Sequence, residues 1–480
     1  MKKLFLILFV FLLVFHLAFA EEILKFENYM DKIKKNLPQL DIYNVDVKKA
    51  KNNIYGAKGI DDYMVDGNLN YIKDTGYQTY SDMRGVNFST KISRKFKGSG
   101  TSIYSTINYN RSEIEGEEKV ITSIQDGQPV YSSLEYSRDR YNPEIEIGFM
   151  QPLLYNAKGI IDRFPIKNAQ LNYEMEKIKR DISKKNTLNY YKKLYFDWIA
   201  KNKTLELMNE SLENVKRIKE LVEDKYKSGL VDRDELEKAN SRVINYKKLV
   251  LNYRMMLDII EKELQVLIDI ESYKPDYDKF DKLFNRACSL CKNKKSTVPF
   301  ENTQNYKIIK KSLERLGLIK KISKNKTLPE LNLMGNIALK TMEDKFSDSL
   351  TEMDDLDYQF GLSLSLPVKN YKAKSEYIDS KLSIERLNYE LKESKNNYKS
   401  SLNLVMEKIE GKSKMMDYIE QNISTLKKEY ETEKEKYERA RFQLQFLLDT
   451  ENNITDERRN KISTKNELIG LYLDYVSLTK

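Results

Sequence analysis

Histidine is almost missing from the sequence, because the only one is His16, near the amino terminus. An imidazole is the usual base or ligand in serine, cysteine and zinc enzymes, so these classes are excluded for the rest of the chain. Catalysis by carboxylates alone would remain open, but no compact acidic motif indicates it. The sequence therefore predicts a protein that is not an enzyme and that uses no cofactor or metal.

Long apolar runs are also absent after residue 20, where no stretch approaches the roughly 20 residues of a membrane-spanning helix. The one apolar run, residues 4–17, follows Lys2 and Lys3 and precedes Ala18-Phe19-Ala20. This order is typical of a secretory signal peptide cleaved after Ala20, and the run is too short to span a bilayer. Because Glu21 and not cysteine follows, we expect an exported protein without an acylated amino terminus.

Cysteine is scarce, and Cys288 and Cys291 form a single C-x-x-C pair. In an exported protein such a pair favours a small disulfide. A redox pair would need a βαβ context, which the flanking charged residues do not provide. A metal site would need two further ligands.

Charge of one sign is not in large excess, since 83 basic residues face 73 acidic ones. The two signs are interspersed, which is typical of solvated helices and not of a phosphate-binding surface. We therefore expect no nucleic-acid partner.

What the sequence does contain is a tandem repeat. The segment Lys225-Tyr226-Lys227-Ser228-Gly229-Leu230 corresponds to Lys436-Tyr437-Glu438-Arg439-Ala440-Arg441 at an offset of 211 residues. Further upstream, Met150-Gln151-Pro152-Leu153 corresponds to Ser365-Leu366-Pro367-Val368 at an offset of 215. The difference of four residues is about one helical turn, which keeps the same face of a helix buried. The two halves are therefore predicted to be copies of one strand-and-helix unit.

Strands are indicated by alternation of apolar and polar residues. The second half has two such segments, 331–339 and 358–366. The first half has four, within 63–71, 86–92, 103–109 and 145–149. The polar stretch from Arg111 to Gln128 is predicted to be a loop.

Two long helices are indicated by apolar residues at three- and four-residue spacing, from about Ile166 to Lys227 and from Leu391 to Tyr437. Lys412 and Glu433 interrupt the second apolar seam. A seam of about six heptads is typical of a coiled coil, and sixty-odd residues at about 1.5 Å each give a rod of roughly 90–100 Å.

Strands with one apolar face can lie in lipid only if every edge is paired, which requires a closed barrel. Two hairpins cannot close one, since the smallest outer-membrane barrels need about eight strands. Three chains with four strands each would supply twelve. The surplus segments of the first half either extend the hairpins outward or add strands, so the exact strand number stays open. The predicted fold class is thus an α+β membrane protein of tandem repeats. Its trimeric twelve-stranded β-barrel continues into an α-helical coiled-coil barrel.

The expected segments follow from these patterns. They are a signal peptide (1–20), an N-terminal helical segment (21–60), barrel strands of the first repeat with extra strands and loops (61–154), a first long helical hairpin (155–270), an inter-repeat equatorial segment (271–328), a barrel hairpin of the second repeat (329–367) and a second long helical hairpin (368–480).

In its duplicated layout and in the Lys225-Tyr226-x-x-Gly229-Leu230 connection, the chain resembles the TolC family of outer-membrane efflux and secretion channels. The resemblance covers nearly the whole mature chain. It implies a homotrimeric passive conduit in outer-membrane lipid that extends into the periplasm. It also implies two partners, a periplasmic adaptor and an inner-membrane pump or ABC-type exporter.

The same resemblance implies roles for particular residues. A periplasmic tip that contacts the adaptor would contain Ser228, Gly229, Leu230, Val231, Ala440, Arg441 and Phe442, although Ser228 replaces the family's valine and Ala440 the second glycine. Asp449 matches a position where the family's constriction often has a carboxylate, so three copies would form an acidic ring. A solvated surface carboxylate is the alternative.

A rival interpretation is a secreted or surface coiled-coil protein with a structural or adhesive function. It would require the alternating segments to form a sheet exposed to water. A redox protein that uses Cys288 and Cys291 is a third interpretation.

Overall fold

The structure of the chain is a computed structural model that describes residues 22–77, 80–125, 128–292, 298–439 and 443–479. The signal peptide and its cleavage site at Ala20 lie outside these residues. The described chain divides into two compact units. One, the sheet unit, contains Val47–Lys177 and Ile308–Glu390, and the other, the helical unit, contains the residues up to Asp46, Ile178–Lys307 and the residues from Leu391 onward.

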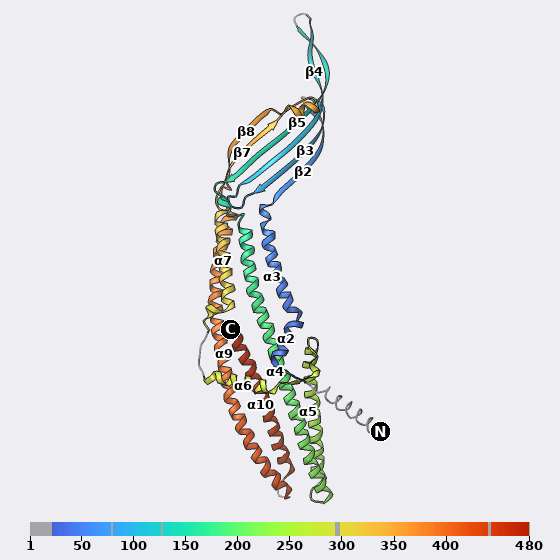
Figure 1. The fold of residues 1–480 in the computed structure, drawn as a ribbon, viewed down its shortest axis with the longest axis vertical. Helices are drawn as coiled ribbons and strands as arrows, with labels where there is room; N and C mark the ends of the chain where they lie inside the picture. The colour runs from blue at the N-terminus through green and yellow to red at the C-terminus, as the bar shows by residue number, and fades with distance from the viewer. Residues whose placement is uncertain (1–21, 78–79, 126–127, 293–297, 440–442, 480) are drawn as a thin grey trace, which may run out of the picture. The chain divides into compact units, whose positions relative to one another are not determined.

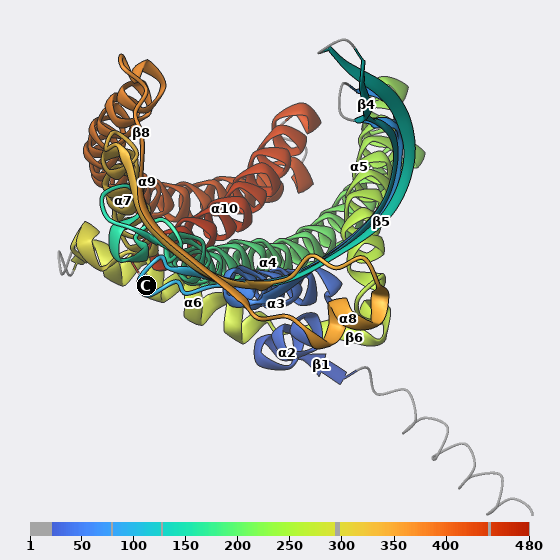
Figure 2. The same ribbon diagram turned by 90° about the horizontal axis from the view of Figure 1, so that it is seen from above.

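The sheet unit contains one six-stranded antiparallel sheet, whose strands lie in the order β2-β3-β4-β5-β7-β8 (Figure 1). Figure 2 shows that the sheet is curved. The strands are β2 (Tyr63–Tyr77), β3 (Tyr80–Lys95), β4 (Ser102–Gln125), β5 (Gln128–Pro152), β7 (Glu330–Lys340) and β8 (Asp355–Ser365). All six segments predicted from alternation are therefore confirmed as strands.

The stretch from Arg111 to Gln128, expected as a loop, is mostly strand. β4 continues to Gln125, and β5 begins at Gln128 and pairs with it along nearly its whole length. The prediction is wrong because it expected a strand only where apolar residues occupy every second position. Beyond Glu115, where β4 no longer pairs with β3, β4 and β5 form a two-stranded ribbon with solvent on both faces, so nothing selects apolar residues at alternate positions.

The sheet has six strands, so the surplus segments of the first half add strands and the count of four per chain does not hold. The first half supplies four strands and the second half two, so the two repeats are not copies of each other in the sheet. Three copies would supply eighteen strands and not twelve. A short helix, α8 (Phe346–Thr351), lies between β7 and β8 and packs Phe346 against Tyr109 and Tyr141 at ring-centroid distances of 5.9 and 6.1 Å.

The helices confirm the expectation of two long segments. The long helices are α4 (Phe164–Lys227) and α9 (Tyr371–Glu438), and their return helices are α5 (Arg233–Gln265) and α10 (Leu444–Thr479). The shorter elements are β1 (Glu22–Leu24), α2 (Phe26–Asn36), α3 (Pro38–Ala57), β6 (Tyr273–Pro275), α6 (Tyr277–Lys292) and α7 (Gln304–Asn325).

The helical unit has its main core where α2, α4, α5, α6 and α10 meet. Tyr195, Trp198 and Ile199 of α4 are almost fully buried there, against Ile33 of α2 and Phe280 of α6. Each of these residues belongs to an apolar stripe at helical spacing, so the stripe faces the core and the charged residues face water. The parallel pair β1–β6 lies beside this core.

Neighbouring helices in the helical unit are linked by polar contacts. α9 is joined to α10 through Asn422 and Glu457, and α4 to α5 through Trp198 and Glu261. α10 is joined to α4 through Ser211 and Thr455. The order within this unit is therefore α9, α10, α4, α5 (Figure 1).

Candidate functional site

One face of the sheet, called here the apolar face, exposes large apolar side chains on all six strands. The pairing of neighbouring strands places these side chains on the same side of the sheet. For example, Val65 lies opposite Ile92, and Ile337 lies opposite Tyr358. The side chains are exposed by 37–75 %. They are Tyr63, Val65, Leu69, Tyr71, Val86, Phe88, Ile92, Ile103, Ile107, Ile145, Ile147, Leu333, Ile337, Tyr358, Phe360, Leu362 and Leu364. A continuous apolar surface of this extent indicates contact with lipid or with another protein.

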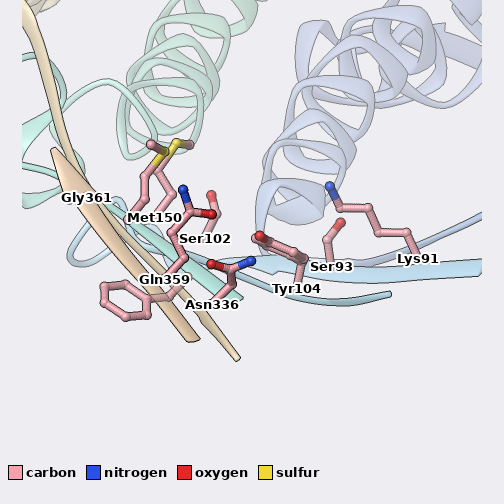
Figure 3. A pocket seen from close by; sticks show the side chains of 11 residues that line it. Lys91, Ser93, Ser102, Tyr104, Met150, Asn336, Gln359 and Gly361 are labelled. Carbon is pink, nitrogen blue, oxygen red and sulfur yellow. The ribbon is translucent and has the colours of Figure 1, made fainter. Parts of the chain in front are cut away.

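The opposite, polar face holds a network of hydrogen bonds. The Tyr104 hydroxyl donates to Glu146 at 3.0 Å, and the Asn336 amide donates to the same carboxylate at 2.5 Å. Lys91 places its ammonium 4.5 Å from the centre of the Tyr104 ring. Lys91, Tyr104 and Asn336 are among the residues that line a cavity of about 470 Å³ (Figure 3). The sheet therefore separates an apolar surface from a polar one.

Gly148 explains how the Tyr104 ring can lie close to the sheet. A Cβ atom on Gly148 would come within 2.5 Å of the Tyr104 ring. Because such an approach is not tolerated, only glycine permits this arrangement at position 148.

The connection between α4 and α5 contains the first predicted tip, Ser228 to Val231. Gly229 has φ of +68°, and Leu230 donates its N–H to the carbonyl of Lys225 at 2.8 Å. Gly229 donates to Tyr226 at 3.0 Å, which completes a Schellman motif at the end of α4. Leu230 is exposed, whereas Val231 packs against a hydrophobic cluster formed by α4, α5, α9 and α10. This cluster, called here the tip cluster, contains Ile218, Val222, Ala239, Tyr437, Leu444, Leu447 and Leu448. The glycine is thus required by backbone geometry, and the exposed Leu230 is available for contact.

The second predicted tip, Ala440 to Phe442, lies outside the described residues. Its flanks are described: α9 ends at Glu438 and α10 begins at Leu444. Leu444, Leu447 and Leu448 are buried in the tip cluster with Val222 and Tyr437. The ends of the two hairpins are therefore packed together in the helical unit.

Asp449 lies on α10 and is half-exposed. Its carboxylate accepts a hydrogen bond from the guanidinium of Arg242 on α5 at 3.0 Å and from Gln445 at 2.8 Å. The sequence reasoning did not anticipate that a cation would partly neutralise this position. An Asp449 ring would therefore carry less negative charge than the carboxylates alone.

A buried contact that sequence reasoning missed lies near the tip. Lys225 is buried, donates to the carbonyl oxygen of Tyr437, and has its ammonium 4.1 Å from the centre of the Tyr437 ring. The Tyr437 hydroxyl in turn donates to Glu235 at 3.1 Å. Burial lowers the pKa of Lys225 below its ordinary value, and Glu235 and Glu438 oppose that shift. The recurrence of Lys-Tyr in both repeats was the only sequence signal for this contact.

A second missed contact is a buried polar network one to two turns further from the tip. Glu451 accepts hydrogen bonds from Tyr246 at 2.8 Å and from Thr455 at 3.3 Å, and Thr455 contacts Ser211 at 2.8 Å. Burial raises the pKa of Glu451 above its ordinary value, although its hydrogen bonds and Arg242 and Arg458 pull it down. This network joins α4, α5 and α10.

Cys288 lies on α6, half-buried beside Ile409 and Leu468. The side chain of Cys291 lies outside the described part of the chain, so the disulfide remains a prediction.

Within the described residues, no helix combines the length and the apolar character needed to cross a membrane. The comparisons with known proteins by sequence gave no match, either to a protein-family model or to a curated protein.

Comparison with solved structures gave matches over nearly the whole chain. CusC, whose structures are described in terms of transmembrane channel formation, aligns with a TM-score of 0.65 at 9 % identity, over 94 % of this chain and 91 % of that chain. The outer membrane protein VceC of Vibrio cholerae aligns with a TM-score of 0.65 at 10 % identity, over 94 % and 95 %. The MtrE outer membrane channel of Neisseria gonorrhoeae gives 0.61 at 10 %, over 94 % and 88 %. The chain therefore has the fold of these outer-membrane channels, in agreement with the TolC-like fold that its repeat indicated.

Proposed function

We propose that the chain is one subunit of a passive outer-membrane channel for export, which extends into the periplasm. The observation that carries this proposal is the apolar face of the sheet, exposed on six strands and backed by a polar face. A sheet with one apolar and one polar face suits a wall between lipid and a water-filled lumen.

The height of the apolar face suits a bilayer. From Tyr63 to Tyr71 of β2 the chain advances about 27 Å at 3.4 Å per residue, or roughly 20 Å along the membrane normal at a tilt of about 40°. The lipid-facing band of outer-membrane barrels is about 25 Å tall. A charged residue marks the end of the apolar face on β4: Arg111 lies opposite Val86 of β3 and Tyr141 of β5.

The open edges of the sheet argue for assembly. No described strand pairs with the outer edge of β2 or of β8, and unpaired backbone groups are not tolerated in lipid. Joining β8 of one copy to β2 of the next would satisfy both edges. Three copies of six strands would close an eighteen-stranded barrel, within the size range of such barrels.

The helical repeat supports the same assembly. In the chain, α10 lies on α4 through Thr455, Arg458 and Asn466, which contact Ser211, Glu210 and Asp197. At the 211-residue offset, Thr455, Ile462 and Asn466 correspond to three α5 residues that are exposed by 55–62 %: Ile244, Leu251 and Met255.

The complementary helix face supports the same conclusion. Thr204 and Leu207 of α4 are buried on the face that carries Ser211, and they correspond to Met415 and Tyr418 of α9, which are exposed by 46 % and 70 %. If α9 of a second copy lay on α5 as α10 lies on α4, both apolar sets would be covered. A homotrimer of this kind has a heterologous interface that closes into a ring.

The remaining roles follow from the resemblance. We assign adaptor contact to the tip around Ser228–Val231 and Ala440–Phe442, and a periplasmic constriction to Asp449. The cargo would be driven by an inner-membrane partner, a pump or an ABC-type exporter, that works through a periplasmic adaptor.

A disulfide experiment tests the assembly. The Ser211 and Thr455 hydroxyls lie 2.8 Å apart, so cysteines at the corresponding positions, Asn422→Cys and Ile244→Cys, should form a disulfide between copies. The control is Ser424→Cys with Ile244→Cys, because Ser424 points to the other side of α9. Both are made with Cys288→Ser and Cys291→Ser.

The expected result is a covalently linked trimer in outer-membrane fractions for the first pair only. A protein that leaves the membrane in urea or salt, with no link between copies, would contradict the proposal and favour a secreted coiled-coil protein.

A further inference from the structure

The connection between β7 and β8, residues 341–354, is fixed to the apolar face of the sheet. Its backbone continues the pairing with β5, because Glu343 donates its N–H to the carbonyl of Tyr141 at 3.1 Å and Tyr141 donates to Glu343 at 2.8 Å. The Phe346 ring of α8 packs on Tyr109 and Tyr141, which lie on the same face as Ile107. Figure 2 shows α8 on the convex side of the curved sheet. The connection therefore lies over the apolar face and not over the polar one.

This part of the apolar face is its border with a charged zone. Four aligned residues on β2, β3, β4 and β5 form a mostly apolar row: Tyr71, Val86, Arg111 and Tyr141. Two residues further along each strand, the next row on the same face is charged at every position: Lys73, Arg84, Glu113 and Asp139. Charged side chains on the lipid-facing side of a barrel are costly within hydrocarbon and tolerated near its boundary. A bilayer in contact with the apolar face would therefore end at the row that α8 partly covers.

α8 itself has an apolar side and an acidic side. Phe346 and Leu350 lie about one turn apart and are exposed by 54 % and 55 %. Asp348 lies about 200° around the helix from each of them, on the opposite side. Ser349 is fully buried, and Met342, just before the helix, is exposed by 59 %. A helix with this division suits the boundary between lipid chains and headgroups.

We propose that α8 is a lipid anchor on the outer wall of the barrel, with Phe346 and Leu350 inserted at the headgroup boundary of the outer leaflet. The inference rests on the proposed function, in which the apolar face contacts lipid and the helices extend into the periplasm. From Tyr141 the chain runs along β5 to Pro152 and then into α4. The end of the sheet that carries α8 is therefore the end away from the periplasm.

The position of α8 selects lipid and not a second copy as its partner. Tyr109 and Tyr141, on which α8 packs, belong to β4 and β5, the third and fourth of six strands. In the proposed assembly a second copy joins at β2 or at β8, roughly 10 Å away from these central strands. The exposed Phe346 and Leu350 continue the apolar face as far as the charged row. The surface that contacts lipid on the strands is therefore also the surface that α8 extends.

Tryptophan reporters in phosphatidylcholine vesicles test this proposal. The full chain is reconstituted with lipid whose acyl chains carry bromine, a quencher of tryptophan emission, either next to the headgroup or near the chain end. The only native tryptophan, Trp198, is buried in the helical unit, so the parent chain gives the blank. Leu350→Trp should lose emission mainly to bromine next to the headgroup, because an interfacial helix inserts by only about 5–10 Å. Ile107→Trp, in the middle of the apolar face, should lose emission mainly to bromine near the chain end.

The matched control is Asp348→Trp, on the opposite side of α8, which should keep its emission in both lipids. If Ile107→Trp is quenched and Leu350→Trp is not, α8 lies in water or under another protein, so the anchor is wrong and the channel stands. Equal quenching of Leu350→Trp and Asp348→Trp also overturns the anchor, because the whole helix would then be immersed. If neither lipid quenches Ile107→Trp, the apolar face does not contact lipid and the proposed function itself is wrong.

Discussion

The two helical hairpins, α4/α5 and α9/α10, have corresponding sequences but different surroundings. Lys225 and Tyr437 are buried against each other, whereas their counterparts Lys436 and Tyr226 are exposed. The residue types are the same at both places. What differs is the neighbouring helix. Within one chain the first repeat contacts the second along one side only, so only one member of each corresponding pair of residues is covered.

The same comparison holds along the hairpins. Thr455 of α10 is buried on α4, and its counterpart Ile244 of α5 is exposed. The exposed member is the more apolar one, which is the reverse of what an isolated chain would favour. These exposed apolar faces of α5 and α9 are the ones that the proposed assembly would cover.

The largest expected effect comes from a charge on the exposed face of α5. Leu251→Asp should leave the single chain folded and weaken association by more than a hundredfold. An unpaired carboxylate in each interface costs about 3–5 kcal/mol. The trimer fraction in detergent, measured by sedimentation, tests this. Asn252→Asp, one residue away, is the matched control, and equal effects of the two would remove α5 from the interface.

Two corresponding buried positions, one in each repeat, can be exchanged for each other's residue type. Val222 is fully buried, and its counterpart Glu433 is buried with one carboxylate oxygen that has no hydrogen-bond partner. Val222→Glu should lower the free energy of unfolding by about 3–5 kcal/mol, because it buries an unpaired charge. Glu433→Val should raise it by about 1–3 kcal/mol by removing an unsatisfied group. Denaturant unfolding in detergent measures both, and a loss of stability in Glu433→Val would show that Glu433 has a partner in the assembly.

The buried Glu451 has Asn240 as its counterpart, so only one repeat should respond to pH here. Because burial raises the pKa of Glu451 above 4.5, the folded chain binds the proton more tightly than the unfolded chain. The stability that Glu451 contributes should therefore be fully present below about pH 4.5 and fall as pH rises through the raised pKa. Glu451→Gln should remove that fall. Thermal unfolding from pH 4 to pH 8 measures it, and parallel curves for both proteins would contradict the assignment.

The smallest effect is expected from the two lysines. Lys225→Met removes a hydrogen bond and a contact with the Tyr437 ring, and should cost about 1–2 kcal/mol. Lys436→Met alters an exposed residue and should change the stability of the single chain by less than about 0.5 kcal/mol. Equal values for the two in the dissociated chain would mean that the comparison of the repeats is wrong.

The sequence predicted the elements well where a periodic pattern had a physical cause. The strands around Val65 and Phe360 alternate because one side of the sheet is apolar and the other polar, and the 3–4 spacing from Leu391 follows from a buried seam. Prediction failed from Arg111 to Gln128, because most of this stretch lies beyond the pairing of β4 with β3, where both faces of the ribbon are exposed and no pattern is imposed.

The candidate site was predictable only in part. Gly229 could be located because an αL position at a helix end favours glycine. The partner of Asp449 could not be found, because Arg242 lies 207 residues away and no local rule links them. The contact between Lys225 and Tyr437 was hidden for the same reason, although the repeat itself was visible.

The amino-acid sequence by itself determined the repeat, the strand and helix segments and the absence of imidazole chemistry, because these depend on residue type and local spacing. The tertiary structure decided the number of strands in the sheet, the ribbon beyond it and which copy of each repeated residue is buried. Those features depend on long-range pairing, which brings together residues that no local pattern relates.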